Sequence, residues 1–389
     1  MKILFVSENY YPNISGVPVV VQYLAEELVR RGNDVAVLTR EMDNAKGDEN
    51  LNGVKIFRIH VYYDILKFYK GEIDRFVNFV RMYKADVIVL EGASVITTDI
   101  LLPHLKNISG IKILHSHGFS RLLIKPFKKL STFKNTIGNT YDWIRWRRYF
   151  SVTLPRYIKY INGVFCLSRI DSSYEYLKKI YKGNVNVIGN AADEAFFKPS
   201  ESNVISKYTQ EPIKSYFLSV ANYMAVKNQI GILEQYYKSG VKDYDMIFIG
   251  RERNYYYDAL IQRKEELEKD FGHRNVHILN NIDRQDIPSI VEGAKLYLVG
   301  SEVEGFSISI IESMAKGVPF ISTNVGNARE LPGGITVDNI NQMHEMLRDL
   351  INDNNRWRDL SEEGKQYAYD QCRVKVAVDK LERLITECR

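Results

Sequence analysis

The sequence predicts an α/β protein built from two successive doubly wound domains, each a parallel sheet covered by helices on both faces. The chain has 389 residues, which is more than one ordinary hydrophobic core accommodates. Short, nearly continuous apolar runs alternate with amphipathic stretches, as in parallel sheets that are buried on both faces. This alternation restarts near residue 215, so we expect two Rossmann-like domains that face a central cleft.

In the first half, the apolar runs predict six strands at residues 3–7, 35–38, 54–59, 87–90, 111–115 and 163–167. Residues 18–30 are predicted to form a helix, because Leu24 and Leu28 belong to an apolar stripe at helical spacing. Gly32 follows this stripe closely, as expected at a helix end.

In the second half, strands are predicted at residues 216–220, 245–249, 276–279, 296–299, 320–322 and 334–337. Helical patterns occupy residues 310–316 and 340–351. We therefore predict an N-terminal domain at 1–197, a polar, proline-containing linker at 198–214, a C-terminal domain at 215–370 and a terminal segment at 371–389.

The composition indicates an ordinary globular protein of a reducing compartment. Apolar residues make up 45% of the chain and charged residues 26%. The three cysteines show neither a paired framework nor metal-ligand spacing. The apolar run at residues 3–7 is too short for a signal peptide, and no run is long enough to span a bilayer. The expected location is the cytoplasm.

Residues 121–159 carry ten Lys or Arg and one acid, a local charge of +9, although the net charge of the whole chain is only +5. If residues 141–150 are helical, Trp143, Trp146, Tyr149 and Phe150 share one face, opposite the arginines. Such a helix suits an anionic membrane surface. The alternative is that the aromatic residues pack on the N-terminal domain and the arginines are solvated. A nucleic-acid partner is not expected, because no recognisable binding module accompanies the charge. The residues predicted to contact acceptor or membrane are Arg121, Lys128, Lys129, Trp143, Arg145, Trp146, Arg147 and Arg148.

The most informative motif is the pair Glu304 and Glu312, which follows a predicted strand and spans a loop and the start of a helix. Gly305 permits close approach of the backbone to a ligand. The N–H groups of Phe306, Ser307 and Ile308 are predicted to be unpaired at the helix start, where the helix dipole favours a phosphate. Glu304 would accept hydrogen bonds from sugar hydroxyls and Glu312 from a ribose diol. The alternative is one loop acid and one solvated helix acid.

Continued by residues 314–319, this pair resembles the E-x7-E motif of retaining GT-B glycosyltransferases, family 4 in particular. The similarity extends along nearly the whole chain. It includes Tyr10-Tyr11-Pro12 with Ser15-Gly16-Val17, the segment 187–193, and residues 219–222 continued to Lys227-Asn228. The resemblance also implies that the last helix, residues 374–388, returns to pack on the N-terminal domain.

The resemblance assigns roles to individual residues. Lys227 would neutralise the donor diphosphate, and His117, which Gly118 follows, would lie near the transferred sugar. Asn222 stands where the family usually has an arginine, so Lys227 or Arg251 would supply the missing charge. The predicted catalytic residues are Glu304, Lys227 and His117. The predicted donor-binding residues are Gly16, Asn222, Lys227, Arg251, Ile282, Gly305, Phe306, Ser307, Ile308 and Glu312.

The activity implied is retaining transfer of a sugar from a nucleotide sugar, a UDP-sugar, to a glycan or lipid-linked acceptor in bacterial cell-surface polysaccharide synthesis. The enzyme would lie at the inner face of the membrane as a peripheral protein. No cofactor or metal is expected, since the acids of Asp243-Tyr244-Asp245 read as turn residues before a strand. Two alternatives stay open: a non-catalytic membrane-associated binder of sugar nucleotides, and a GT-B sugar-nucleotide epimerase.

Overall fold

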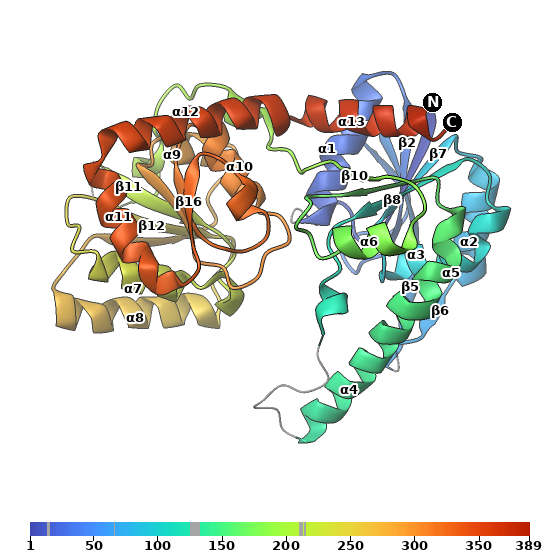
Figure 1. Ribbon diagram of the computed structural model, residues 1–389, viewed down its shortest axis with the longest axis horizontal. Coiled ribbons are helices and arrows are strands. Elements are labelled where there is room, and N and C mark those ends of the chain that lie inside the picture. Colours follow the sequence, from blue (N-terminus) through green and yellow to red (C-terminus); the bar gives the residue numbers. More distant parts are fainter. Residues whose placement is uncertain (14–15, 66, 125–132, 210–212, 214) are drawn as a thin grey trace. The chain divides into compact units, whose positions relative to one another are not determined.

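The computed structural model describes residues 1–389 except 14–15, 66, 125–132, 210–212 and 214 (Figure 1). The chain forms two compact units, one from residues 1–190 with 374–389 and the other from residues 191–373. Each unit contains its own sheet, of eight and six strands. The predicted α/β class with two parallel-sheet domains is confirmed.

The first unit is built on a sheet of strand order β10-β9-β8-β7-β1-β2-β4-β3. Its strands are parallel except for the β3–β4 pair. The strands are β1 (Lys2–Ser7), β2 (Asp34–Arg40), β3 (Glu49–Leu51), β4 (Val54–Ile59), β7 (Val87–Glu91), β8 (Ile111–Ser116), β9 (Gly163–Cys166) and β10 (Val185–Val187). A separate small hairpin pairs β5 (Val61–Tyr63) with β6 (Tyr69–Gly71).

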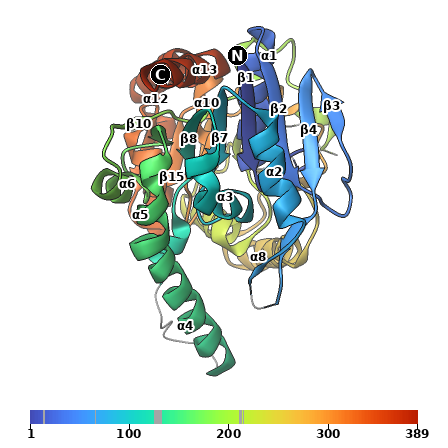
Figure 2. The same ribbon diagram turned by 90° about the vertical axis from the view of Figure 1, so that its right-hand side faces the viewer.

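The helices of the first unit cover this sheet, except for α4 (Figures 1 and 2). They are α1 (Val17–Arg30), α2 (Ile73–Tyr83), α3 (Ile96–Leu101), α4 (Phe133–Arg148), α5 (Leu154–Tyr157), α6 (Tyr174–Ile180) and α13 (Val374–Glu387). The side chains of α2 and α3 share one apolar cluster with Leu4 and Val6 of β1. The terminal helix α13 packs beside α1, where the Arg31 guanidinium lies 2.7 Å from Asp379 and 2.7 Å from Glu382. The last helix is therefore part of the first unit.

The second unit has an entirely parallel sheet of order β13-β12-β11-β14-β15-β16. Its strands are β11 (Tyr216–Val220), β12 (Asp245–Gly250), β13 (Val276–Asn280), β14 (Leu296–Val299), β15 (Phe320–Thr323) and β16 (Gly334–Val337). Its helices are α7 (Gln229–Lys238), α8 (Tyr255–Phe271), α9 (Ile287–Glu292), α10 (Ile308–Ala315), α11 (Met343–Asn352) and α12 (Asn354–Gln371). Successive residues of β11 point to opposite faces of the sheet and belong to different apolar clusters. Phe217 packs with α7 and α8, and Leu218 packs with α9 and α10.

Every strand predicted from an apolar run is present, with ends that differ by a few residues at most. The sequence missed β3, β5, β6 and β10, each of three residues and too short or too exposed for a period to show. The predicted linker at 198–214 also differs from the structure, because the chain enters the second unit after Asn190.

The strand order places a topological switch point in each unit. In the first unit it lies between β1 and β7, and in the second between β11 and β14. Loops that leave the carboxyl ends of two such strands diverge to opposite faces, and the crevice between them is where doubly wound sheets bind ligands.

One helix departs from this compact packing. In the two views of Figures 1 and 2, α4 extends away from the sheet of its own unit. Among the described residues, no helix combines the length and the apolar character that crossing a bilayer requires.

Candidate active site

The switch point of the second unit brings Lys227 and Glu304 together. Lys227 ends a short 3-10 turn after β11, and Glu304 lies in the loop after β14. Lys227 Nζ donates to Glu304 Oε1 at 2.5 Å, and Ser301 Oγ donates to the same oxygen at 2.7 Å. Within the described residues, Glu304 Oε2 has no hydrogen-bond partner. The carboxylate is thus held through one oxygen, and the other is left for a ligand.

A neighbouring loop, after β15, supports this acidic loop. Thr323 Oγ1 donates to the carbonyl of Ser301 at 2.6 Å. Gly326 has φ +55°, and a Cβ at that position would lie 3.1 Å from the Cβ of Glu304, so glycine allows this close contact. Buried Asn327 accepts a hydrogen bond from the N–H of Ser307 at 3.1 Å. The expectation that this N–H is free for phosphate is wrong.

Glu312 lies on α10 in a partly exposed position. Burial raises the pKa of this carboxyl from 4.5 to about 7; Arg284 opposes the shift and Asp193 adds to it. No hydrogen bond to its side chain occurs in the described part of the chain. Glu312 therefore changes charge near neutral pH, unlike the solvated helix acid of the alternative interpretation.

The other predicted donor residues fall into three groups. Asn222 and Arg251 are exposed, and the nearest ionic partner of Arg251 is Glu252 at 3.6 Å. Ile282, Phe306 and Ile308 all pack on the same apolar cluster of the second unit. The exposed Gly305 lies beside them in the loop after β14.

Gly16 belongs to the first unit, where it precedes α1 with φ +62°. An added Cβ would meet no atom within 4 Å there. Glycine is favoured at this position by its backbone conformation rather than by crowding within the unit.

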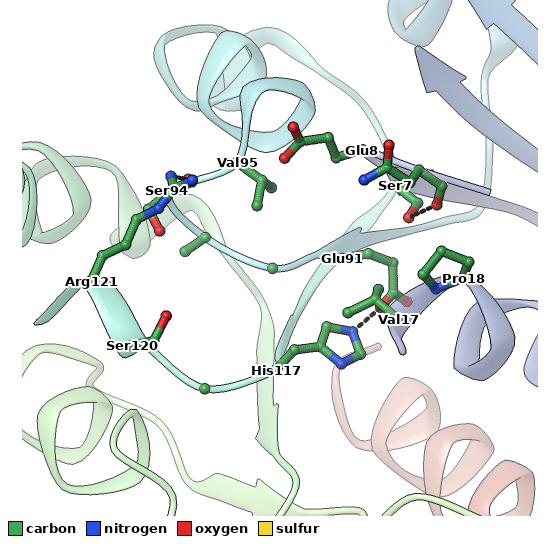
Figure 3. A pocket seen from close by; sticks show the side chains of 14 residues that line it. Ser7, Glu8, Val17, Pro18, Glu91, Ser94, Val95, His117, Ser120 and Arg121 are labelled. Atoms are coloured by element: carbon green, nitrogen blue, oxygen red, sulfur yellow. Dashed lines mark hydrogen bonds and ion pairs between the residues drawn. The ribbon is translucent and has the colours of Figure 1, made fainter. Parts of the chain in front are cut away.

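The first unit contains a cavity of about 230 Å³ at the carboxyl ends of β1, β7 and β8 (Figure 3). His117 and Arg121, both predicted from the sequence, line it together with Glu8, Glu91 and Ser94. The remaining lining residues are Ser7, Asn9, Val17, Pro18, Gly92, Ala93, Val95, Gly118 and Ser120. Carboxylates, hydroxyls and a guanidinium in one small cavity suit a polyhydroxylated ligand.

Sequence reasoning missed Glu91, which lines this cavity, and preferred His117 to His115, which lies behind it. Glu91 Oε2 lies 2.6 Å from His117 Nε2 and 2.8 Å from His115 Nδ1. Burial acts to raise the pKa of Glu91, but the two histidines outweigh it and lower that pKa below its ordinary value. Burial also lowers the pKa of His115. At neutral pH the carboxyl is ionised and His115 is uncharged.

This cluster offers the ligand types that a metal ion uses, with its three ligand atoms within 4.8 Å of one another. Its closest distances are nevertheless those of hydrogen bonds. Ligands at about 2.0–2.2 Å from a tetrahedral zinc would be separated by about 3.3–3.6 Å. In the present arrangement Glu91 and His117 are joined by a hydrogen bond, and His115 lies against them. In the second unit, Asp245 begins β12 and faces His277 at 3.6 Å.

The basic aromatic segment divides between core and surface. Trp146, Tyr149 and Phe150 are buried in the core of the first unit, so the packing alternative holds for them and their predicted membrane-facing position is wrong. Arg121 and Arg145 lie over the Trp146 ring at 4.2 and 4.6 Å. Arg147 and Arg148 are exposed, and Trp143 is partly exposed. Lys128 and Lys129 lie outside the described residues.

Two family models match this chain, and they divide it much as the fold does. "Glycosyltransferase Family 4" matches residues 14–196, and "Glycosyl transferases group 1" matches residues 200–367. The two matches together leave only short segments of the chain uncovered.

Similar proteins agree with these models. One human protein, a subunit of phosphatidylinositol N-acetylglucosaminyltransferase, is 24% identical over all of this chain and 80% of its own length. The O-antigen chain mannosyltransferase B of Escherichia coli is 25% identical over 43% of this chain and 46% of its own. Among solved structures, HepE of Anabaena with UDP and glucose superimposes with a TM-score of 0.70 at 16% identity, over 99% of both chains. The family models, the paired Rossmann-like units and the glutamate motif together show that this chain belongs to the family 4 glycosyltransferases of GT-B fold.

Proposed function

We propose that this glycosyltransferase moves a sugar from a UDP-sugar to a lipid-linked or glycan acceptor with retention of anomeric configuration. The Lys227–Glu304 pair at the switch point of the second unit carries the proposal. The ammonium group of Lys227 suits a diphosphate, and Glu304 Oε2 suits a sugar hydroxyl. Glu312, on the helix that starts beside them, suits a ribose diol.

The chemistry we propose needs no protein nucleophile. The bond between the sugar C1 and the donor phosphate oxygen breaks, and the acceptor oxygen bonds C1 from the same face. The acceptor proton passes to the departing phosphate oxygen, so atoms and charge balance. The protein contributes orientation and stabilisation of the leaving diphosphate. Lys227 supplies a positive charge there, which is why we propose a metal-independent reaction without a cofactor.

The names of similar proteins support the finer assignments. HepE was solved with UDP and glucose, which supports a UDP-sugar donor. The human relative is named for transfer to phosphatidylinositol, which supports a lipid acceptor. The Escherichia coli relative is named for O-antigen chains, which supports a role in bacterial surface polysaccharide synthesis.

We also propose that one face of α4 and its continuation contacts an anionic membrane at the cytoplasmic side. Tyr141, Ile144 and Val152 are exposed by 48%, 56% and 47% of their surface. Tyr141, Ile144 and exposed Arg148 recur at three- or four-residue spacing and so share one face of α4, and Val152 follows in the π-helical turn Tyr149–Thr153. Apolar and basic side chains on one face favour binding to anionic lipid. This face replaces the buried Trp146 face.

Product analysis tests the reaction. The protein is incubated with a panel of UDP-sugars and with polyprenyl-phosphate-linked and free glycan acceptors, with and without EDTA. NMR then determines the anomeric configuration of the product. We expect a product with the configuration of the donor and an unchanged rate with EDTA. An inverted product or loss of activity with chelator would refute this mechanism. An epimerised donor in the absence of acceptor would favour the epimerase alternative.

A further inference from the structure

The cluster of Glu91, His115 and His117 follows directly from strand pairing. Glu91 and His115 are direct partners in the register of β7 and β8, so their side chains point to the same face of the sheet. His117 follows His115 by two residues, a spacing that returns its side chain to that face. The two imidazole rings accordingly lie with centroids 3.8 Å apart. The motif His115-Ser116-His117, read alone, does not reveal this third partner on β7.

Within the cluster, the contact between Glu91 and His117 has the geometry of a hydrogen bond. His117 Nε2 lies 2.6 Å from Glu91 Oε2. His115 Nδ1 is also near that oxygen, at 2.8 Å, but it makes no hydrogen bond because the direction of approach is poor. His115 instead stacks on Phe165, with centroids 4.0 Å apart. His117 is therefore held by Glu91 at its edge and by the His115 ring at its face.

Besides the two ring nitrogens of His115, Glu91 Oε1 and His117 Nδ1 lack a hydrogen-bond partner in the described part of the chain. Glu91 Oε1 is buried without a hydrogen-bond partner, which costs about 1–3 kcal/mol unless a ligand or water satisfies it. Nδ1 of His117 lies on the ring edge away from Glu91 in Figure 3 and also lacks a partner. Both residues line the 230 Å³ cavity.

We propose that Glu91 is a positioning residue: its carboxylate holds the proton of His117 on Nε2 and so keeps Nδ1 as the acceptor for a substrate hydroxyl in this cavity. The proposal rests on the proposed function for the identity of the substrate, a hydroxyl-bearing sugar or acceptor group. Glu91 acts through His117, because a carboxylate that accepts from Nε2–H fixes the neutral tautomer.

The test reads the tautomer directly and needs no substrate. Long-range ¹H–¹⁵N NMR of the whole protein at neutral pH distinguishes a protonated Nε2 from a protonated Nδ1, and the variant H117Q assigns the signal. In the wild type we expect His117 with the proton on Nε2. In E91Q, where the amide can both donate and accept, we expect a mixture of tautomers. The control E8Q removes another carboxylate of the same cavity and should leave the His117 tautomer unchanged.

Kinetics then link the tautomer to the reaction. We expect E91Q to lower kcat about 10- to 100-fold, the range of a lost supporting contact, with a smaller change in KM for the donor. Wild-type protein with the proton on Nδ1, or E91Q with unchanged tautomer and unchanged kcat, would overturn the proposal. If the tautomer responds as expected but no sugar is transferred by the wild type, the proposed reaction fails and the positioning role stands.

Discussion

At the scale of single residues, Glu304 differs from the neighbouring acid Glu302 in the hydrogen bonds that its carboxylate accepts. Its Oε1 accepts from both Lys227 and Ser301, while Glu302 in the same loop is exposed. We predict that E304Q lowers kcat/KM for sugar transfer by about 100- to 1000-fold, the effect of losing a transition-state contact. The affinity for UDP, which lacks the sugar, should change little.

The matched control for this variant is E302Q, which removes an exposed carboxylate two residues away. Steady-state kinetics and UDP titration of both variants separate the two roles. Near-wild-type turnover in E304Q would show that Glu304 is not a catalytic residue.

The raised pKa of Glu312 predicts how the stability of the protein depends on pH. Its pKa is 4.5 in an unfolded chain and about 7 in the folded protein. Between these values the unfolded chain is ionised while the folded protein stays protonated. The contribution of this carboxyl to the free energy of unfolding, relative to E312Q, is therefore fully present below pH 4.5. It decreases as the pH rises from 4.5 and is lost once the pH passes 7. We expect E312Q to be more stable at pH 8 by about 1–2 kcal/mol, a value reduced for partial exposure.

Thermal melts of both proteins from pH 4 to 8 check this. The difference in Tm should grow up to pH 7 and then remain constant. A difference independent of pH would mean that the carboxyl titrates at an ordinary pKa.

The site residues that the sequence proposed and the contacts that it missed differ in one physical respect. Lys227, Glu304 and His117 follow strands, and the ends of parallel strands meet at one edge of a sheet. The pairing of the Ser307 N–H with Asn327 depends on a loop twenty residues later, and the contact of Glu91 depends on the register of two strands. Neither pairing has a local sequence signal.

At the scale of elements, the aromatic stripe of α4 and the residues after it is compatible with two outcomes, contact with a membrane or packing on the first unit. An aromatic stripe buries apolar surface equally well against lipid or against its own domain. Here the domain receives Trp146, Tyr149 and Phe150, and the Tyr149 hydroxyl donates to buried Asp99 at 2.5 Å. The sequence left open whether residues 141–150 form a helix, and the orientation of this segment is set by partners on α3 that no helical period reveals.

The proposed membrane-contacting face of α4 can be tested by lipid binding. We expect the double variant I144D/V152D to lower binding to vesicles of phosphatidylglycerol and phosphatidylcholine at least tenfold, because two acids oppose both apolar insertion and anionic lipid. Sedimentation with vesicles measures this. The control M82D changes a residue of α2 that is 76% exposed and should bind as the wild type does. Equal binding by all three proteins, or equal binding to neutral vesicles, would refute the membrane face.

At the scale of the whole molecule, the two sheets could be predicted because parallel strands buried on both faces appear as continuous apolar runs. The boundary between the two units was harder to predict. Residues 191–209 carry polar residues typical of a linker, yet Phe196 and Ile205 are buried in the second unit. The composition of a segment does not show which single apolar residues are buried, so the unit boundary at Asn190 was not predicted.

Donor binding at Lys227 underlies the proposed reaction, and calorimetric titration with UDP measures it. We predict one UDP per chain for the wild type and for the control K238A, which removes an exposed lysine of α7. K227A should bind at least tenfold more weakly, since it lacks the charge that we propose for contact with the diphosphate. Equal affinity of K227A and wild type, or no binding of UDP or any other nucleoside diphosphate to the wild type, would contradict donor binding at Lys227.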